Sequence, residues 1–262
     1  MDAASLNSSQ KLPKKLVKFI KSLRTKKSRL REKAFVVEGA KSVKELLLSD
    51  YNVTIVIGTP QFMDTHTWLL AKESLLTFQV APAFLASLGT FQSNNAALAV
   101  VNMPVNKPLT LANNVCGLVL DDIRDPGNLG AILRIAHWYG IDKVICSETT
   151  VDLYNPKVLH ASMGAFTQVH VYYTDLVSYL SKTTLPVLGA FVQGENVHTI
   201  SFPPAGWLVI GNESRGISHK LMPYINQKIG IPQYRQVESL NAAIATAVIC
   251  DNWRRWEEGV EA

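Results

Sequence analysis

The chain has 262 residues, of which 47% are hydrophobic, so it can form one large domain or two modest ones without help from disulfides. No stretch is long and apolar enough to span a bilayer, and the polar N-terminal segment lacks the features of a secretory signal. The three cysteines, Cys116, Cys146 and Cys250, have no paired spacing, which excludes a disulfide framework and a cysteine-based metal site. We therefore expect a cytoplasmic protein.

The net charge of +5 is distributed unevenly. Between Lys11 and Lys33 stand eleven lysines and arginines and one acid, so this segment carries +10 and the remainder −5. Four apolar residues recur within it at helical spacing: Leu16, Phe19, Ile20 and Leu23. The pattern predicts an amphipathic helix that docks by its apolar face and presents its basic residues outward.

A polyanion is the natural partner of such a helix, because neutralising phosphates releases counterions. The alternative is an ordinary solvated charged face. The candidate RNA contacts are Lys14, Lys18, Lys21, Arg24, Lys26, Lys27, Arg29 and Arg31.

The rest of the N-terminal half reads as a small α/β unit. Strands are predicted over 35–39, 51–57 and 96–101, and helices over 41–48 and 68–74. Two prolines in Asn102–Pro108 then predict a linker. We place the domain boundary there, with residues 1–105 as an RNA substrate-binding domain and 106–262 as a second domain.

The second half alternates apolar runs with helical patterns, which is typical of a parallel sheet with crossover helices. The predicted strands cover 117–120, 143–146, 169–172, 187–191, 207–210 and 229–231, and the helices 129–139, 156–166, 175–180, 218–224 and 240–257. Ligands bind such sheets outside the carboxyl ends of the strands, so the loops there are candidate sites.

The first of these loops contains Asp125-Pro126-Gly127-Asn128-Leu129-Gly130, followed by Arg134 in a helix. Asn128 can cap that helix, and the alternative is a simple capped turn whose arginine faces solvent. Asp121 and Asp122 are adjacent in an extended segment, so they point opposite ways, which argues against a shared carboxylate metal site. No Gly-x-Gly-x-x-Gly is present, so a dinucleotide fingerprint does not fit.

Two further loops contain unusual polar residues. Gly211-Asn212-Glu213-Ser214-Arg215-Gly216 follows a strand directly, and its glycines allow a ligand to approach the backbone. The stretch from Ile231-Pro232 to Ser239-Leu240-Asn241 enters the last helix, where Ser239 or Asn241 could simply be a cap. Each loop alone is weakly informative.

Together, in this order, the three loops resemble the signature motifs of the SpoU (TrmH-like) methyltransferases of the SPOUT superfamily. Ala161-Ser162-Met163-Gly164-Ala165 is similar to the helix between the first two motifs, and Phe35–Gly39 resembles the start of the family's N-terminal substrate-binding domain. Gln233-Tyr234-Arg235 departs from the family's more usual Met and Gly, so the donor pocket differs locally or Arg235 contributes to RNA binding.

The resemblance implies a fold and an activity. The fold would be a ribosomal-protein-like α/β domain followed by a parallel-sheet SPOUT domain with a C-terminal trefoil knot, which no sequence pattern reveals. The activity would be methylation of an RNA ribose 2′-hydroxyl by S-adenosylmethionine, without a metal. Family members form homodimers through the knot region. The implied donor-binding residues are Leu188, Gly189, Ala190, Ile210, Gly211, Asn212, Ile231, Pro232, Ser239 and Leu240.

The implied catalytic residues are Asn128, Arg134, Glu213, Ser239 and Asn241. A guanidinium is a poor base, so the simpler role of Arg134 is to stabilise the developing oxyanion and hold the adjacent phosphate; acceptance of the hydroxyl proton by Arg134 is the open alternative. Asn128 would position Arg134 and the ribose. The expected substrate is ribosomal RNA, because the separate N-terminal domain is often absent from members that act on transfer RNA. The alternatives are a transfer-RNA enzyme and a non-catalytic RNA-binding scaffold.

Overall fold

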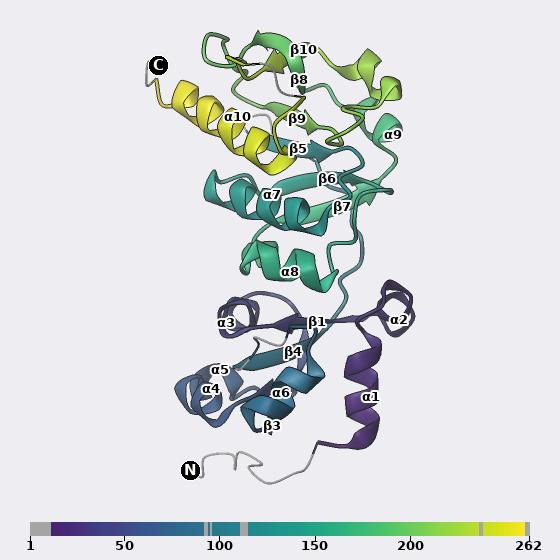
Figure 1. Ribbon diagram of the computed structural model, residues 1–262, viewed down its shortest axis with the longest axis vertical. Helices are drawn as coiled ribbons and strands as arrows, with labels where there is room; N and C mark the ends of the chain where they lie inside the picture. The colour runs from purple at the N-terminus through teal and green to yellow at the C-terminus, as the bar shows by residue number, and fades with distance from the viewer. Residues whose placement is uncertain (1–11, 92–93, 95, 111–114, 236–237, 260–262) are drawn as a thin grey trace. The chain divides into compact units, whose positions relative to one another are not determined.

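The computed structural model describes residues 12–91, 94, 96–110, 115–235 and 238–259 (Figure 1). The chain divides into two compact units, which are described separately. The first comprises the residues up to Val105 together with Tyr154–Thr167, and the second comprises Asn106–Leu153 together with the residues from Gln168 onward. None of the described helices is long and apolar enough to cross a membrane.

The first unit contains a four-stranded sheet in the order β1-β4-β2-β3. The strands are β1 (Ala34–Glu38), β2 (Val53–Gly58), β3 (Leu76–Gln79) and β4 (Ala97–Asn102), and β4 runs antiparallel to both of its neighbours. The helices are α1 (Lys14–Ser22), α2 (Lys26–Glu32), α3 (Ala40–Leu48), α4 (Pro60–Thr65), α5 (Thr67–Leu70), α6 (Pro82–Leu88) and α8 (Pro156–Ser162). The predicted α/β character of this unit is confirmed.

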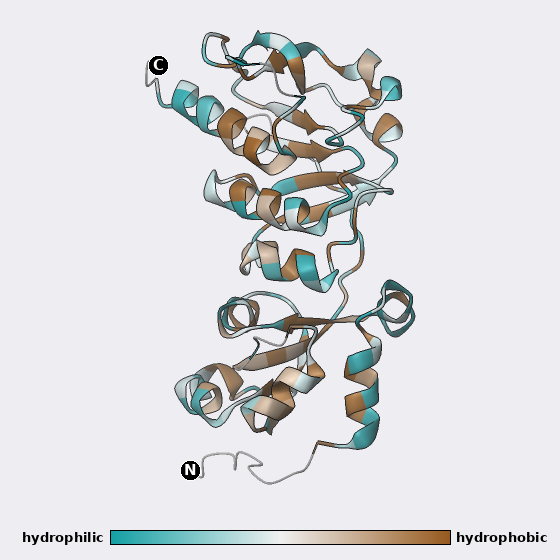
Figure 2. Ribbon diagram, in the orientation of Figure 1, coloured by the Kyte–Doolittle hydropathy of each residue, from teal (hydrophilic) through white to brown (hydrophobic). Residues whose placement is uncertain are grey.

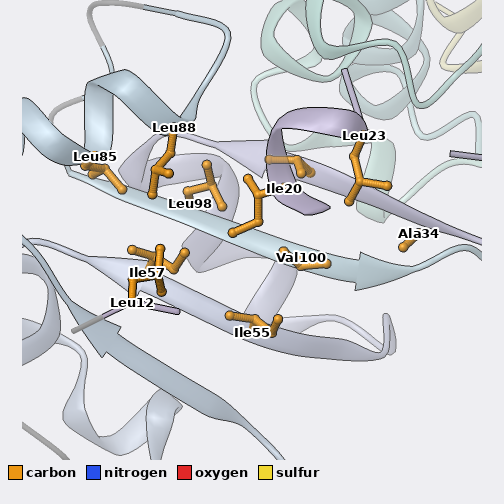
Figure 3. Close-up of a cluster of buried hydrophobic side chains, with 11 residues drawn as sticks. Leu12, Ile20, Leu23, Ala34, Ile55, Ile57, Leu85, Leu88, Leu98 and Val100 are labelled. Atoms are coloured by element: carbon orange, nitrogen blue, oxygen red, sulfur yellow. The ribbon is translucent and has the colours of Figure 1, made fainter. Parts of the chain in front are cut away.

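Helix α1 docks by its apolar face, as its spacing predicts. Ile20 and Leu23 are each 1% exposed, and Figure 3 shows Ile20 beside Leu98 and Val100 of β4. The lysines of α1 are exposed on the other face, so this helix appears in Figure 2 with both brown and teal stretches. Burial of this stripe fixes the direction in which the basic side chains point.

One predicted RNA contact in this segment is wrong. Arg29 is 3% exposed, and its guanidinium donates to the carbonyls of Leu23 (3.0 Å) and Arg24 (2.9 Å). It therefore satisfies the carboxyl end of α1 from inside the protein. The other predicted contacts are exposed, although Arg24 also donates to the carbonyls of Leu88 and Gly89.

The segment 154–167 groups with the first unit, which the predicted continuous second domain did not anticipate. Tyr154 and Phe166 flank Phe35, with ring centroids 4.3 and 6.5 Å away. The predicted helix 156–166 ends early, because Met163 and Gly164 both adopt positive φ angles; a short 3-10 turn, η1 (Ala165–Thr167), follows. Aromatic packing thus draws a piece of the second half of the sequence into the first unit.

Other predicted boundaries in this unit shift. The helix expected over 68–74 is present in part, as α5, which begins at Thr67 and ends at Leu70. A separate helix that was not predicted, α4, begins at Pro60, where Thr59 accepts from the amide of Phe62. Strand β3 and helix α6 were not predicted. Strand β3 is short and half exposed, which weakens its pattern, and α6 begins at a proline that also reads as a turn signal.

The second unit contains a six-stranded sheet in the order β10-β8-β9-β5-β6-β7, with every neighbouring pair parallel. The strands are β5 (Cys116–Leu120), β6 (Lys143–Ser147), β7 (His170–Thr174), β8 (Val187–Asn196), β9 (Gly206–Ile210) and β10 (Gln227–Gly230). Strands β6 and β7 follow β5 on one side of the sheet, whereas β9 and β8 lie on its other side, so the strand order reverses between β5 and β9. In open parallel sheets ligands bind at such a reversal, outside the carboxyl ends of the strands, so the loops after β5 and β9 are candidate ligand-binding loops. The predicted parallel sheet is confirmed.

Among its described residues, the second unit also contains four helical segments: α7 (Pro126–Trp138), α9 (Leu176–Leu180), the 3-10 helix η2 (His219–Tyr224) and α10 (Ala242–Glu257). Helix α10 lies along α7 (Figure 1), with its first turns brown and its end teal in Figure 2. The trefoil knot concerns the path between β10 and α10. Residues 236–237 of that path lie outside the described residues, so the knot stays a prediction.

Candidate active site at the strand ends

The first loop connects β5 to α7. Asp125, and not Asn128 as predicted, caps α7: its carboxylate accepts from the backbone amide of Asn128 at 2.8 Å, and Pro126 occupies the first turn. Because Asp125 takes the capping position, the side-chain amide of Asn128 can bond elsewhere. Asn128 lies half-buried in the first turn of α7.

Three predicted catalytic residues form one hydrogen-bonded chain. Asn241 caps α10 with its oxygen, which accepts from the amides of Ala243 (3.0 Å) and Ile244 (3.3 Å). Its nitrogen therefore faces the side-chain oxygen of Asn128 and donates to it at 2.8 Å. Asn128 in turn donates to Glu213. A helix cap thus orients both amides, and all three strand-end loops meet in this chain.

In the second loop, the backbone of Gly211 lies against the backbone of Gly216. A Cβ on Gly211 would lie 2.3 Å from the backbone of Gly216, so only glycine fits at position 211, and Gly216 has φ +64. Asn212 accepts from the amides of Ser214 and Arg215 and donates to the carbonyl of Asp122 at 2.9 Å. Ser239 donates to the carbonyl of Glu213 at 3.4 Å.

A cavity of about 1160 Å³ lies between the second and third loops. Eight of the ten predicted donor-binding residues line it: Ala190, Ile210, Gly211, Asn212, Ile231, Pro232, Ser239 and Leu240. Leu188 and Gly189 do not. Leu188 is 1% exposed, and Gly189 packs against Phe191 and Ile217, so both lie in the interior beside β8, and their assignment as donor-binding residues stays a prediction.

Several lining residues were not predicted. Val192 and Gln193 line the cavity because β8 continues five residues beyond its predicted end at Phe191, and Lys228 lines it from β10. Tyr234 and Arg235 also line it, and Tyr234 is 93% exposed. In the sequence, the only feature that drew attention to Tyr234 and Arg235 was that Gln233-Tyr234-Arg235 departs from the family's more usual Met and Gly.

The structure does not bring Arg134 into the network. Its side chain is exposed on α7, and no hydrogen bond or ion pair joins it to the described residues. Its guanidinium is therefore free to contact a ligand, but positioning by Asn128 is not seen. Within the described part of the chain, no group of three or more His, Cys, Asp and Glu side chains could hold a metal ion.

Comparisons with known proteins indicate the family of each part of the chain. The model of the SpoU rRNA Methylase family matches residues 116–251, and that of an MRM3-like substrate binding domain matches residues 14–99. The chain is 29% identical to the 23S rRNA (guanosine(2553)-2′-O)-methyltransferase RlmP of Bacillus subtilis, over 89% of this chain and 93% of that protein.

Solved structures share the fold. A Porphyromonas gingivalis protein described as an RNA methyltransferase of the TrmH family superposes with a TM-score of 0.83 at 34% identity, covering 94% of this chain and 99% of the other. The SpoU methyltransferase AviRb of Streptomyces viridochromogenes, in complex with AdoMet, has a TM-score of 0.83 at 22% identity, with the same coverage.

The parallel sheet and its strand-end cavity are those of a methyltransferase of the SPOUT superfamily. Within that superfamily, the chain belongs to the SpoU rRNA methylase family. Membership confirms three predictions: the family itself, an RNA (ribose-2′-O)-methyltransferase as the enzyme class, and S-adenosylmethionine as the methyl donor.

Proposed function

We propose that this protein methylates a 2′-hydroxyl of ribosomal RNA, and that Asn128, Arg134, Glu213, Ser239 and Asn241 form its active site. The observation that carries the site is the chain Asn241–Asn128–Glu213, which joins three loops far apart in sequence beside the cavity. The relatives compared above support ribosomal RNA, since RlmP is named for a 23S rRNA activity.

The cavity suits S-adenosylmethionine. Ile210, Ile231 and Leu240 offer apolar contacts to the adenine and ribose, and the backbone at Gly211 allows close approach. The bound donor supplies an electrophilic methyl group on a sulfonium. Ser239 lies between the cavity and the carbonyl of Glu213 to which it donates, so it orients groups at the boundary between donor and RNA.

The remaining residues act on the RNA. Arg134, exposed and unpaired among the described residues, stabilises the oxyanion that develops as the hydroxyl proton leaves, and holds the neighbouring phosphate. Asn128 and Asn241 are held in fixed orientations by the α10 cap, so they present a constant surface to the ribose. Glu213 accepts from Asn128 and fixes the second loop.

The first unit binds the substrate in this proposal. The exposed basic residues of α1 and α2 contact phosphates: Lys14, Lys18, Lys21, Arg24, Lys26, Lys27 and Arg31. Such contacts increase affinity without selecting a sequence.

We also propose a homodimer formed through the region around α7 and α10. Trp138 of α7 is 80% exposed and Ile244 of α10 is 55% exposed, so these two adjacent helices carry large apolar side chains outside the core. Exposed apolar groups of this kind are typical of interaction surfaces.

The proposed location is the cytoplasm. The three cysteines are free and buried, which accords with a reducing compartment.

The test is incubation of the purified protein with tritiated S-adenosylmethionine and separate pools of unmodified ribosomal and transfer RNA, followed by mapping of alkali-resistant ribose sites. Label is expected at one ribosomal 2′-hydroxyl. The Arg134→Ala protein should bind donor normally but lose at least roughly 100-fold in turnover, a loss typical of removing an oxyanion-stabilising group.

The other outcomes are equally informative. Label only in transfer RNA would keep the chemistry and overturn the substrate. RNA binding without label in either pool would favour a non-catalytic scaffold. Full turnover by a folded Arg134→Ala protein would remove the central residue assignment.

A further inference from the structure

Asp122 has a left-handed backbone conformation, which aspartate adopts more readily than most other residues that carry a Cβ. Its φ is +58, in the left-handed region that few residues other than glycine adopt. Its backbone is held on both sides: the amide donates to the hydroxyl of Ser147 at 2.9 Å, and the carbonyl accepts from Asn212 at 2.9 Å. Such strain persists only where the surroundings enforce it, and it often accompanies function.

This conformation directs the Asp122 carboxylate toward two arginines from different loops. Arg124 donates to one carboxylate oxygen at 2.9 Å and Arg215 donates to the other at 3.0 Å. The Asp122 side chain is only 15% exposed, whereas those of Arg124 and Arg215 are 60% and 63% exposed. A half-buried carboxylate thus holds two solvent-facing guanidinium groups in fixed places.

Stability does not account for this arrangement, because ion pairs with such exposed partners contribute little to folding. The group of three carries a net charge of +1. Each guanidinium has five N–H donors and is bound here to Asp122 through one nitrogen, so most of its donors remain for a ligand. Two pre-oriented arginines match the geometry of phosphate oxygens.

Arg124 and Arg215 lie near the donor cavity, where the proposed reaction takes place. Arg215 lines the donor cavity, and Arg124 precedes the α7 cap Asp125 by one residue. An anion bound between them would therefore lie at the rim of the cavity. An RNA chain whose ribose reaches the donor must place its own phosphates near that rim.

We propose that Arg124 and Arg215 bind a phosphate of the RNA backbone beside the target nucleotide, with Asp122 as the positioning residue that holds both. This inference rests on the proposed function for its substrate.

The experiment measures the affinity of the full-length protein for a short single-stranded RNA of mixed sequence across a salt series. Arg124→Gln and Arg215→Gln should each weaken binding roughly tenfold at low salt and lower the slope of log K against log salt by about 0.7. Lys182→Gln is the matched control, since it removes one exposed positive charge after α9, and it should change neither quantity appreciably.

Asp122→Asn gives the sharpest result. Asparagine tolerates the left-handed region, so the fold is kept while the anchor charge is lost. If net charge alone mattered, this variant would bind RNA more tightly. Positioning predicts weaker binding instead, because both arginines are released.

Two results would overturn the proposal: tighter RNA binding by Asp122→Asn, or arginine variants that behave like Lys182→Gln. A third would reassign the site: Arg215→Gln weakening donor binding in calorimetry without affecting RNA would indicate that this arginine holds the donor. These binding measurements need no turnover. A protein that binds RNA through this pair but transfers no methyl group would therefore contradict only the proposed function.

Discussion

Asn241 performs two tasks with the two ends of one side chain. Its oxygen caps α10, and its nitrogen donates to Asn128. The cap determines which way the amide faces, and hence which way Asn128 faces Glu213. Helix capping and active-site geometry are thus linked through a single residue, and substitutions can separate them.

Asn241→Asp should keep the cap but lose the donor to Asn128. We expect the free energy of unfolding to stay within about 0.5 kcal/mol of the parent, while turnover falls roughly tenfold or more, because Asn128 loses the hydrogen bond that orients its amide toward Glu213. Asn241→Ala should lose turnover and also about 1 kcal/mol of stability. Urea unfolding and single-turnover methylation measure the two effects, and equal stability losses in both variants would contradict this separation.

At the scale of elements, the basic segment shows how similar residues take different roles. Arg29 and Arg31 lie on the same short helix, α2, two positions apart. Arg29 is buried against the end of α1, whereas the side chain of Arg31 is 65% exposed and pairs with Glu32. Composition predicts the charge of this segment, but packing decides which arginines can reach RNA.

Arg29→Ala should lower the free energy of unfolding by about 1–3 kcal/mol, because the carbonyls of Leu23 and Arg24 lose their donor. Arg31→Ala should leave stability within about 0.5 kcal/mol, as surface substitutions usually do. In the salt-dependent RNA-binding assay, Arg31→Ala should lower the slope, a sign of a lost phosphate contact. A stable Arg29→Ala protein with weakened RNA binding would reverse the two assignments.

At the scale of the whole molecule, burial shifts the pKa values of several thiol and phenol groups upward. It raises the pKa of Tyr51 and Tyr179 to about 12, and that of Cys250 to about 12. For Cys116, burial and then the charge of Glu257 raise the pKa to about 12. Burial also raises the pKa of Cys146.

Because these folded-state pKa values exceed the unfolded ones of 9.0 and 10.0, the unfolded chain loses protons first as pH rises. Stability should be fully present below about pH 9 and should fall between about pH 9 and 12. Urea unfolding across this range measures the fall. Tyr179→Phe should make it shallower, and Tyr234→Phe, at a 93% exposed position, should not. A flat profile would contradict these shifts.

A substitution on α10 tests whether the whole molecule forms the proposed dimer. Ile244→Glu places a charge at a 55% exposed apolar position on α10, so it should convert a dimer to a monomer in sedimentation without changing the circular dichroism. Ser178→Glu, at an exposed position on α9, is the control and should leave the assembly intact. A monomeric parent protein would contradict the proposal directly.

Local sequence determined much of this protein. The apolar runs of the second half predicted all six parallel strands, because buried strands need continuous hydrophobic residues, and the spacing of Ile20 and Leu23 predicted the buried face of α1. The three polar loops were also visible, because chain breaks and polar side chains after apolar strands stand out in any sequence. Their residues supported the family assignment that the comparisons confirm.

Tertiary structure alone decided which of these residues meet. Asn128, Glu213 and Asn241 touch because strand order brings their loops together. Tertiary packing likewise decides the burial of Arg29 and brings Arg215 to the carboxylate of Asp122. Hydrogen bonds between residues far apart in sequence leave no periodic pattern, so only the folded chain shows them.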